Sequence, residues 1–166
     1  MARFMSTVES AAAIVATAPS GANANQLFAN LVASANAGYK LRRLTIGVRA
    51  GVGAPTSQQL TVALVRTTAR GTATTTNAPK ALDPNSLQTS SITGLDVAWS
   101  AVPTATWTAP YFYEVSFNSQ SGVDLPAELL EEWIVGVGAG NGFGFINVGN
   151  ALPTAHVLTM SVEHEE

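Results

Sequence analysis

Charge is what this sequence has least of. Eight Lys and Arg and eleven Asp and Glu make up 11% of its 166 residues, against about 25% in ordinary globular domains. Hydrophobic residues account for 46%, so the chain can build a core. A weakly charged surface repels its neighbours little, which suits a protein that spends its life in an assembly. A genome that favours Ala, Gly, Thr and Val would give the same composition, and the two explanations are compatible.

The sequence also lacks cysteine, which excludes disulfides, thiolate zinc sites and thiol nucleophiles. Its net charge of −3 provides no basic field for nucleic acid, so no nucleic-acid partner is predicted. No apolar run approaches the roughly 18–20 residues of a membrane-spanning helix, and the first residues lack the layout of a signal peptide. We therefore expect a protein that is made in the cytoplasm and has no membrane partner.

Apolar and polar residues alternate in several segments, which is typical of half-buried strands. In residues 43–50, Leu44, Ile46 and Val48 share one face, and Arg43 and Arg49 lie on the other. The same alternation occurs at 60–65, 113–117 and 158–163, with further candidates at 8–16, 26–33, 87–99, 133–137 and 143–148. Turn-forming residues separate them. The pattern predicts an all-β protein, an antiparallel β-sandwich or jelly roll of about eight strands.

Three segments depart from this pattern. Residues 1–7, with Phe4 and Met5, are predicted to form an N-terminal arm, ahead of a single sandwich domain over residues 8–166. Residues 70–110 are rich in Thr, Ala and Pro and are expected to form a long extended segment lying across the sandwich or onto a neighbour. Residues 124–132 are expected to form a short helix or a turn that joins two strands.

None of the motifs predicts catalytic machinery. The glycines of residues 136–144 occupy every second position and match neither the GxGxxG nor the GxxxxGK[ST] nucleotide-binding pattern. They are expected to leave one face of a hairpin without side chains, so that another backbone can pack closely against it. His156 is expected at a strand edge and His164 in a solvated acidic tail, without metal-ligand spacing. A converging carboxylate pair stays open, because two acids can meet from distant positions. The sequence predicts no catalytic, cofactor or metal site, and a protein that is not an enzyme.

Some exposed side chains are candidates for contacts with other proteins. Two arginines on one strand face could pair with acids of a partner, or could form an ordinary solvated surface. The aromatic run at 107 and 111–113 cannot be buried entirely on one side, so its outer members could anchor an interface or line a sugar site. The candidate subunit or capsid contacts are Phe4, Met5, Arg43, Arg49, Trp107 and Tyr111.

A family resemblance rests on three groups of segments taken in order. They are residues 40–48; residues 71–74 leading into 81–84, 98–100 and 103–104; and residues 125–127 followed by 145–151. Their order and spacing resemble small β-rich structural proteins of tailed bacteriophages, some of which are jelly-roll capsid decoration (cement) proteins. The resemblance spans residues 38–166, and residues 128–132 depart from it as an insert. None of its motifs is catalytic, so it supplies no functional residues.

The resemblance implies a homo-oligomer, specifically a homotrimer, that binds the major capsid protein on the surface of the virion and stabilises the shell. Such a protein would be made in the cytoplasm of the bacterial host. The alternative is a tail- or fibre-associated module that binds a carbohydrate or a receptor. From Trp133 to Val162 there is no charged side chain, so we expect the core and a subunit interface to meet there.

Overall fold

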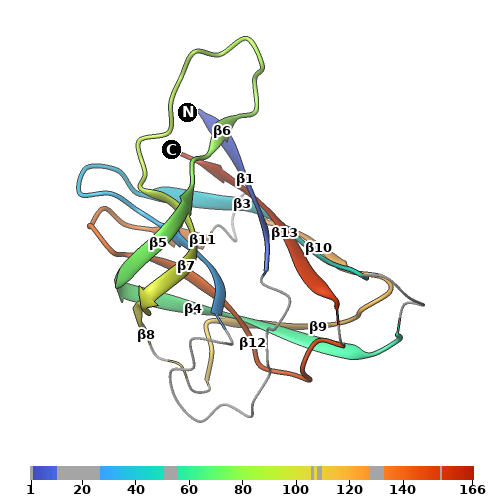
Figure 1. Ribbon diagram of the computed structural model, residues 1–166. Coiled ribbons are helices and arrows are strands. Elements are labelled where there is room, and N and C mark those ends of the chain that lie inside the picture. Colours follow the sequence, from blue (N-terminus) through green and yellow to red (C-terminus); the bar gives the residue numbers. More distant parts are fainter. Residues whose placement is uncertain are drawn as a thin grey trace.

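The computed structural model describes residues 2–10, 27–50, 56–105, 107, 110–127, 133–153 and 155–166. Within these ranges the chain forms strands and no helix, and the strands build two antiparallel sheets that pack together (Figure 1). The predicted all-β sandwich is confirmed. The strands are β1 (Arg3–Glu9), β2 (Leu27–Val32), β3 (Tyr39–Arg49), β4 (Gln59–Ala69), β5 (Thr72–Asn77), β6 (Lys80–Ala81), β7 (Gly94–Ala101), β8 (Thr104–Ala105), β9 (Tyr113–Asn118), β10 (Val123–Pro126), β11 (Trp133–Val135), β12 (Gly142–Asn147) and β13 (Val157–Glu165).

The first sheet, sheet A, has the strand order β10–β3–β13–β1–β6, and β11 also pairs with β3. β13 lies at its centre, between β3 and β1. In the register of β13 and β3, Met160 stands opposite Ile46 and Val162 opposite Leu44. Because side chains alternate along a strand, this register gathers the apolar residues on one face and the polar residues on the other.

The second sheet, sheet B, has the order β5–β7–β2–β12–β4–β8, and β9 also pairs with β4. All six residues of β2 and all six of β12 are buried. On β4, Val62 and Leu64 face sheet A, and Ala63 and Val65 face away from it. Sheet B is therefore covered on both faces over its central strands.

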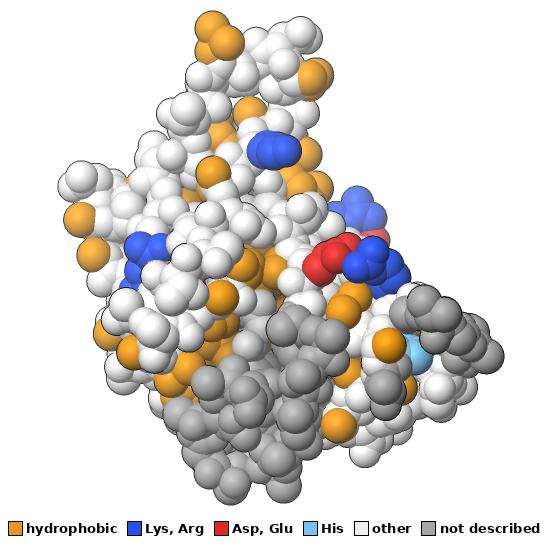
Figure 2. All heavy atoms as spheres, viewed as in Figure 1, with side chains coloured by type: hydrophobic (Ala, Val, Ile, Leu, Met, Phe, Trp, Pro, Cys, Tyr) orange, Lys and Arg blue, Asp and Glu red, His pale blue; other side chains and the backbone are white. Residues whose placement is uncertain are grey.

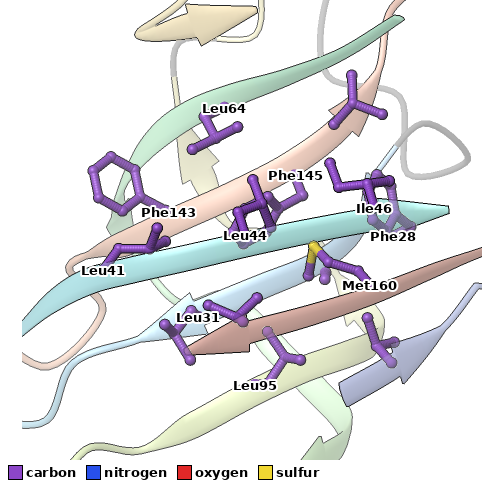
Figure 3. Packing of buried hydrophobic residues seen from close by; sticks show 14 of the residues in the cluster. Phe28, Leu31, Leu41, Leu44, Ile46, Leu64, Leu95, Phe143, Phe145 and Met160 are labelled. Carbon is purple, nitrogen blue, oxygen red and sulfur yellow. The ribbon is translucent and has the colours of Figure 1, made fainter. Parts of the chain in front are cut away.

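The main core fills the space between the two sheets (Figure 3). Sheet A contributes leucine, isoleucine and methionine side chains, and sheet B contributes phenylalanines among its aliphatic residues. A smaller apolar cluster on the opposite face of sheet B holds Leu27, Ala63, Val65 and Ile146. The labelled members of the main core are Leu41, Leu44, Ile46 and Met160 from sheet A, and Phe28, Leu31, Leu64, Leu95, Phe143 and Phe145 from sheet B.

Two of the alternating glycines, Gly140 and Gly142, let another backbone approach closely, but β11 and β12 lie in different sheets, so the predicted hairpin is wrong. At Gly142 an added Cβ would lie 2.3 Å from the carbonyl oxygen of Leu31. At Gly140 it would lie 2.8 Å from the backbone nitrogen of Arg70, and φ is +109°, a conformation that L residues rarely adopt. These two positions therefore need glycine.

A buried carboxylate holds the β5–β7 pair to the rest of sheet B. Asp96 on β7 is 0% exposed, and it accepts hydrogen bonds from Arg70 Nε at 2.7 Å and Nη2 at 2.6 Å. Thr76 Oγ1 on β5 donates a further hydrogen bond to it at 2.5 Å. Arg70 follows β4 directly, so this side-chain network links three strands of the sheet.

The predicted N-terminal arm is wrong for the described residues of that segment. Arg3–Glu9 forms β1, which pairs with β13 over seven residues and with β6 on its other side. Phe4 is 2% exposed, and its ring stacks on that of His164. The segment joins the sheet because the buried residues Phe4, Ser6 and Val8 alternate with more exposed ones and so match the inward face of β13.

The central segment is also more regular than predicted. Residues 70–110 contain β5 and β7, which are members of sheet B, together with the two-residue strands β6 and β8. The part without strands is the stretch 82–93, which projects beyond the sheets at the top of Figure 1. Residues 124–126, predicted to lie in a short helix or turn, instead belong to β10, and residues 128–132 lie outside the described ranges.

Candidate interaction surface

The outward face of sheet A is a polar surface formed by regular strands, and we call it the A face. Each of its strands places every second side chain there. Cross-strand rows run from β1 through β13 to β3, and one of them joins Thr7, Ser161 and Thr45. The A face comprises Arg3, Met5, Thr7 and Glu9 of β1, Thr159, Ser161, Glu163 and Glu165 of β13, Lys40, Arg42, Arg43, Thr45, Gly47 and Arg49 of β3, and Asp124 of β10.

Opposite charges on the A face are paired across neighbouring strands. Arg43 Nε donates to Asp124 Oδ1 at 2.8 Å, and Thr45 Oγ1 donates to the same oxygen at 3.0 Å. The hydrogen bond from Arg43 lowers the pKa of the Asp124 carboxyl below its usual value. The other pairs are Arg3 with Glu163 at 3.3 Å, Arg42 with Glu165 at 2.7 Å, and Arg49 with Glu9 at 2.7 Å.

Short hydroxyl side chains occupy the middle of the A face. Thr7, Thr45, Thr159 and Ser161 line a shallow open depression of about 740 Å³, bounded on one side by the turn at residues 119–122. A second hollow of about 280 Å³ continues from Thr45 and Ser161 toward Met5. The A face is thus a hydroxyl-lined trough, and ion pairs lie around it.

Few charged side chains are visible on the side of the molecule shown in Figure 2. Most of its described side chains are uncharged or hydrophobic, and at the right of the view acidic and basic side chains lie together. Paired charges of this kind cost less to bury than single ones, because each keeps its partner when water leaves. The A face can therefore be covered by another protein without an unpaired charge among these ion pairs.

The six predicted contact residues are distributed over different parts of the fold. Met5, Arg43 and Arg49 lie together on the A face. Phe4 does not, because it is buried inside sheet A against His164, so its prediction as a contact is wrong for the folded chain. Trp107 and Tyr111 are half-buried and pack against the apolar cluster on the far side of sheet B.

The other aromatic residues of that run are also engaged within the fold. Phe112 is 39% exposed, and Arg66 lies over its ring at 4.5 Å from the centroid. Tyr113 packs against Trp133 with ring centroids 4.8 Å apart, and it contacts the main core. The aromatic run therefore mainly covers sheet B.

A histidine, an acid and a serine meet at the end of β13. His164 is 0% exposed in its side chain, which contradicts its prediction as part of a solvated tail. Its Nε2 lies 3.2 Å from Glu166 Oε1, and Ser90 Oγ donates to that same carboxylate oxygen. Burial lowers the pKa of His164, and Glu166 opposes this shift.

This trio lacks the order that activates a serine. A nucleophilic serine needs the imidazole as its base, with the acid behind the imidazole. Here the serine donates to the acid, so the hydroxyl proton has no path to the histidine in this arrangement. Glu166 instead connects the stretch 82–93 to the sheet, because its second oxygen also accepts the backbone N–H of Ser91 at 2.6 Å.

The described residues contain no group of three or more His, Cys, Asp or Glu side chains placed to hold a metal ion. Across the same part of the chain, no helix is long and apolar enough to cross a membrane. Comparison of the chain with protein-family models, with curated proteins and with solved structures found no match.

Sequence reasoning missed the trough as a site. The alternation of Thr159, Ser161 and Glu163 placed these residues on one outward face, and that was the available signal. What was missing is the pairing of β13 with β1, whose residues come from the opposite end of the chain. Only that pairing puts Thr7 beside Ser161 and completes the row to Thr45 on β3.

Proposed function

We propose that this chain is a non-enzymatic structural protein of a tailed-phage virion, a capsid decoration protein that binds the outer capsid lattice and stabilises the shell. The observation that carries this proposal is the A face, a broad strand surface with internally paired charges and a hydroxyl-lined trough. Its occupant would be the major capsid protein. Binding only to the assembled lattice would lower the free energy of the shell by mass action.

The dimensions of the A face can be set beside those of known protein interfaces. Four strands spaced about 4.8 Å apart and seven residues rising about 3.4 Å each cover roughly 450 Å² in projection. A stable one-to-one complex buries about 800 Å² of accessible surface on each partner, and side chains that stand out from the sheet make the accessible area of the face larger than its projection. The A face is therefore wide enough for a contact with one capsid subunit, and several linked copies would bind more tightly than one through avidity.

The alternative function, a tail or fibre module for a glycan, depended on outward-facing aromatic rings at Trp107 and Tyr111. Both rings pack against the apolar cluster of sheet B, so this support for a sugar site is lost. Copy number separates the two functions. Quantitative mass spectrometry of purified particles should find hundreds of copies for a shell protein, and a handful would contradict the proposal.

The role of the A face is tested by one added charge. Ser161→Lys places an unpaired cation in the middle of the trough, whereas Thr74→Lys places the same cation on the exposed strand β5 of the other sheet. We expect Ser161→Lys to lose binding to expanded shells in a sedimentation assay, while Thr74→Lys binds normally. Shells decorated with the second variant should also rupture at a higher temperature than bare shells. Equal binding by both variants would contradict the proposed role of the A face.

A further inference from the structure

We propose that copies of this chain associate with one another by inserting Leu87 of one copy into an apolar hollow beside β11 of a second copy. The stretch 82–93 between β6 and β7, which we call the projecting loop, extends beyond the sandwich (Figure 1) and contains Leu87. Leu87 is 99% exposed, the highest value among the exposed large hydrophobic residues of the described chain. This contact does not depend on the capsid being the other partner.

Two hydrogen bonds within the projecting loop stabilise turns around Leu87. The backbone N–H of Asn85 donates to Asp83 Oδ1 at 2.9 Å, and that of Gln88 donates to Ser86 Oγ at 3.1 Å. Local bonds of this kind favour turns without help from other elements. Leu87 is the middle residue of the second turn, which favours a defined position for it before any partner arrives.

The end of the projecting loop is fixed to both sheets. Ser90 and Ser91 donate to the Glu166 carboxylate beside sheet A, and Thr93 Oγ1 donates to the Ala33 carbonyl after β2 at 2.8 Å. Ile92 is buried, at 6% exposed. Because little chain freedom remains to be lost, an apolar contact through Leu87 retains most of its favourable free energy.

The complementary feature is a hollow of about 230 Å³ between β11 and the start of β3. Ile134 and Val137, which are 51% and 58% exposed, supply open apolar surface, and Tyr39 and Val135 lie behind them. Nothing stands within 4 Å of the position that a Cβ of Gly136 would occupy. The volume is several times the roughly 30 Å³ that one water molecule occupies in the liquid, so it admits a branched aliphatic side chain.

A second copy is the occupant that these features favour. Glu166 lines the hollow and also accepts a hydrogen bond from the projecting loop. The hollow and the loop that carries Leu87, which we call the knob, therefore lie at the same end of the molecule. Leu87 does not fill the hollow of its own copy, because it is almost fully exposed. β11 pairs with β3 along one edge, and in the described residues no strand pairs with its other edge.

The symmetry follows from the two different surfaces involved. A contact between Leu87 and a different surface of the next copy is heterologous and generates a ring or an open filament, unless two copies exchange loops and form a reciprocal pair. Each of these arrangements presents several A faces in one assembly. The assembly should weaken greatly when the single leucine is made polar.

Light scattering and sedimentation of the full chain over a range of concentrations test the knob. We expect the wild type to associate, and Leu87→Ser to weaken the association by roughly ten- to a hundredfold in the dissociation constant, as the loss of one buried leucine implies. Thr89→Ala, two residues away on the same exposed loop, is the matched control and should associate like the wild type. A monomeric wild type, or equal association of Leu87→Ser and wild type, would overturn the proposal.

The role of the hollow is tested by substitutions in its lining. Gly136→Leu fills it from within the same copy, and the open space around Gly136 means that the fold should keep its melting temperature while association is lost. Because the chain has no cysteine, oxidation of a Leu87→Cys, Val137→Cys double variant should give covalently joined copies. Absence of such products under conditions where the variant associates would show that the knob meets another surface, and the proposal would fail.

Discussion

The strongest test of the fold concerns Asp96→Asn. This substitution keeps the size of the side chain but removes its charge and turns an amide NH₂ toward donors of Arg70 and Thr76. A hydrogen bond to a charged group contributes about 1.5–3 kcal/mol, and breaking a buried ion pair costs about 3–5 kcal/mol. The Arg70 side chain is 36% exposed and can recover some hydration, so we expect a loss of about 2–4 kcal/mol in the free energy of unfolding.

Urea unfolding followed by tryptophan fluorescence measures this loss. With a slope of about 2 kcal/mol per molar urea, the midpoint should fall by about 1–2 M. Asp124→Asn is the matched control, because Asp124 also pairs with an arginine but is 44% exposed, and its midpoint should stay near that of the wild type. Equal midpoints for the two variants would refute the reasoning, as would strict additivity of Asp96→Asn with Arg70→Met.

Three further predictions concern other buried groups. Because burial lowers the pKa of His164 from its ordinary 6.5, the unfolded chain binds that proton first. The free energy of unfolding should thus decrease as pH falls below about 6.5, by at most about 1.4 kcal/mol per pH unit from this one group. A His164→Gln variant whose free energy of unfolding, measured in urea, falls with pH just as steeply would contradict this. Gly140→Ala should lower the melting temperature while Gly136→Ala leaves it unchanged, since only the first meets backbone, and equal shifts would count against the crowding argument. Tyr39→Phe deprives the buried N–H of Phe143 of its acceptor and should cost about 1–3 kcal/mol in urea unfolding; an unchanged midpoint would mean that another group replaces the hydroxyl.

The fold class was predictable because alternation is a local property. Residues 43–50 and 158–163 showed their inward and outward faces directly, and both faces are as predicted in β3 and β13. Residues 1–7 failed because the partner of Phe4 is His164, and a match across the whole chain leaves no local mark. The tail prediction for His164 failed for the same reason, although Val162 and His164 continue the alternation of the strand.

The central segment was mispredicted because its stabilising groups are not apolar. β5 consists mainly of threonine and is largely exposed, so it lacks the hydrophobic pattern of a core strand. It is held by Thr76 and by the contact of Asp96 with Arg70, which lies outside both β5 and β7. The candidate surface was half predictable: Arg43 and Arg49 were placed on an outward face, but the trough beside them requires three strands in register.

The central position of β13 also sets the order in which the chain can fold during synthesis. β3 and β1 are not neighbours in sheet A, and both must wait for residues 157–165 to enter between them. All strands of sheet B leave the ribosome before β13 does, so part of the apolar inner face of sheet B is exposed to solvent while β13 is made. Chains arrested before β13 already contain β3, β10 and β11, but they lack the strand that joins β3 to β1. Part of the apolar face of sheet B is then expected to stay uncovered, which favours aggregation. We therefore expect substitutions that weaken the nine residues of β13 to lower the yield of soluble protein.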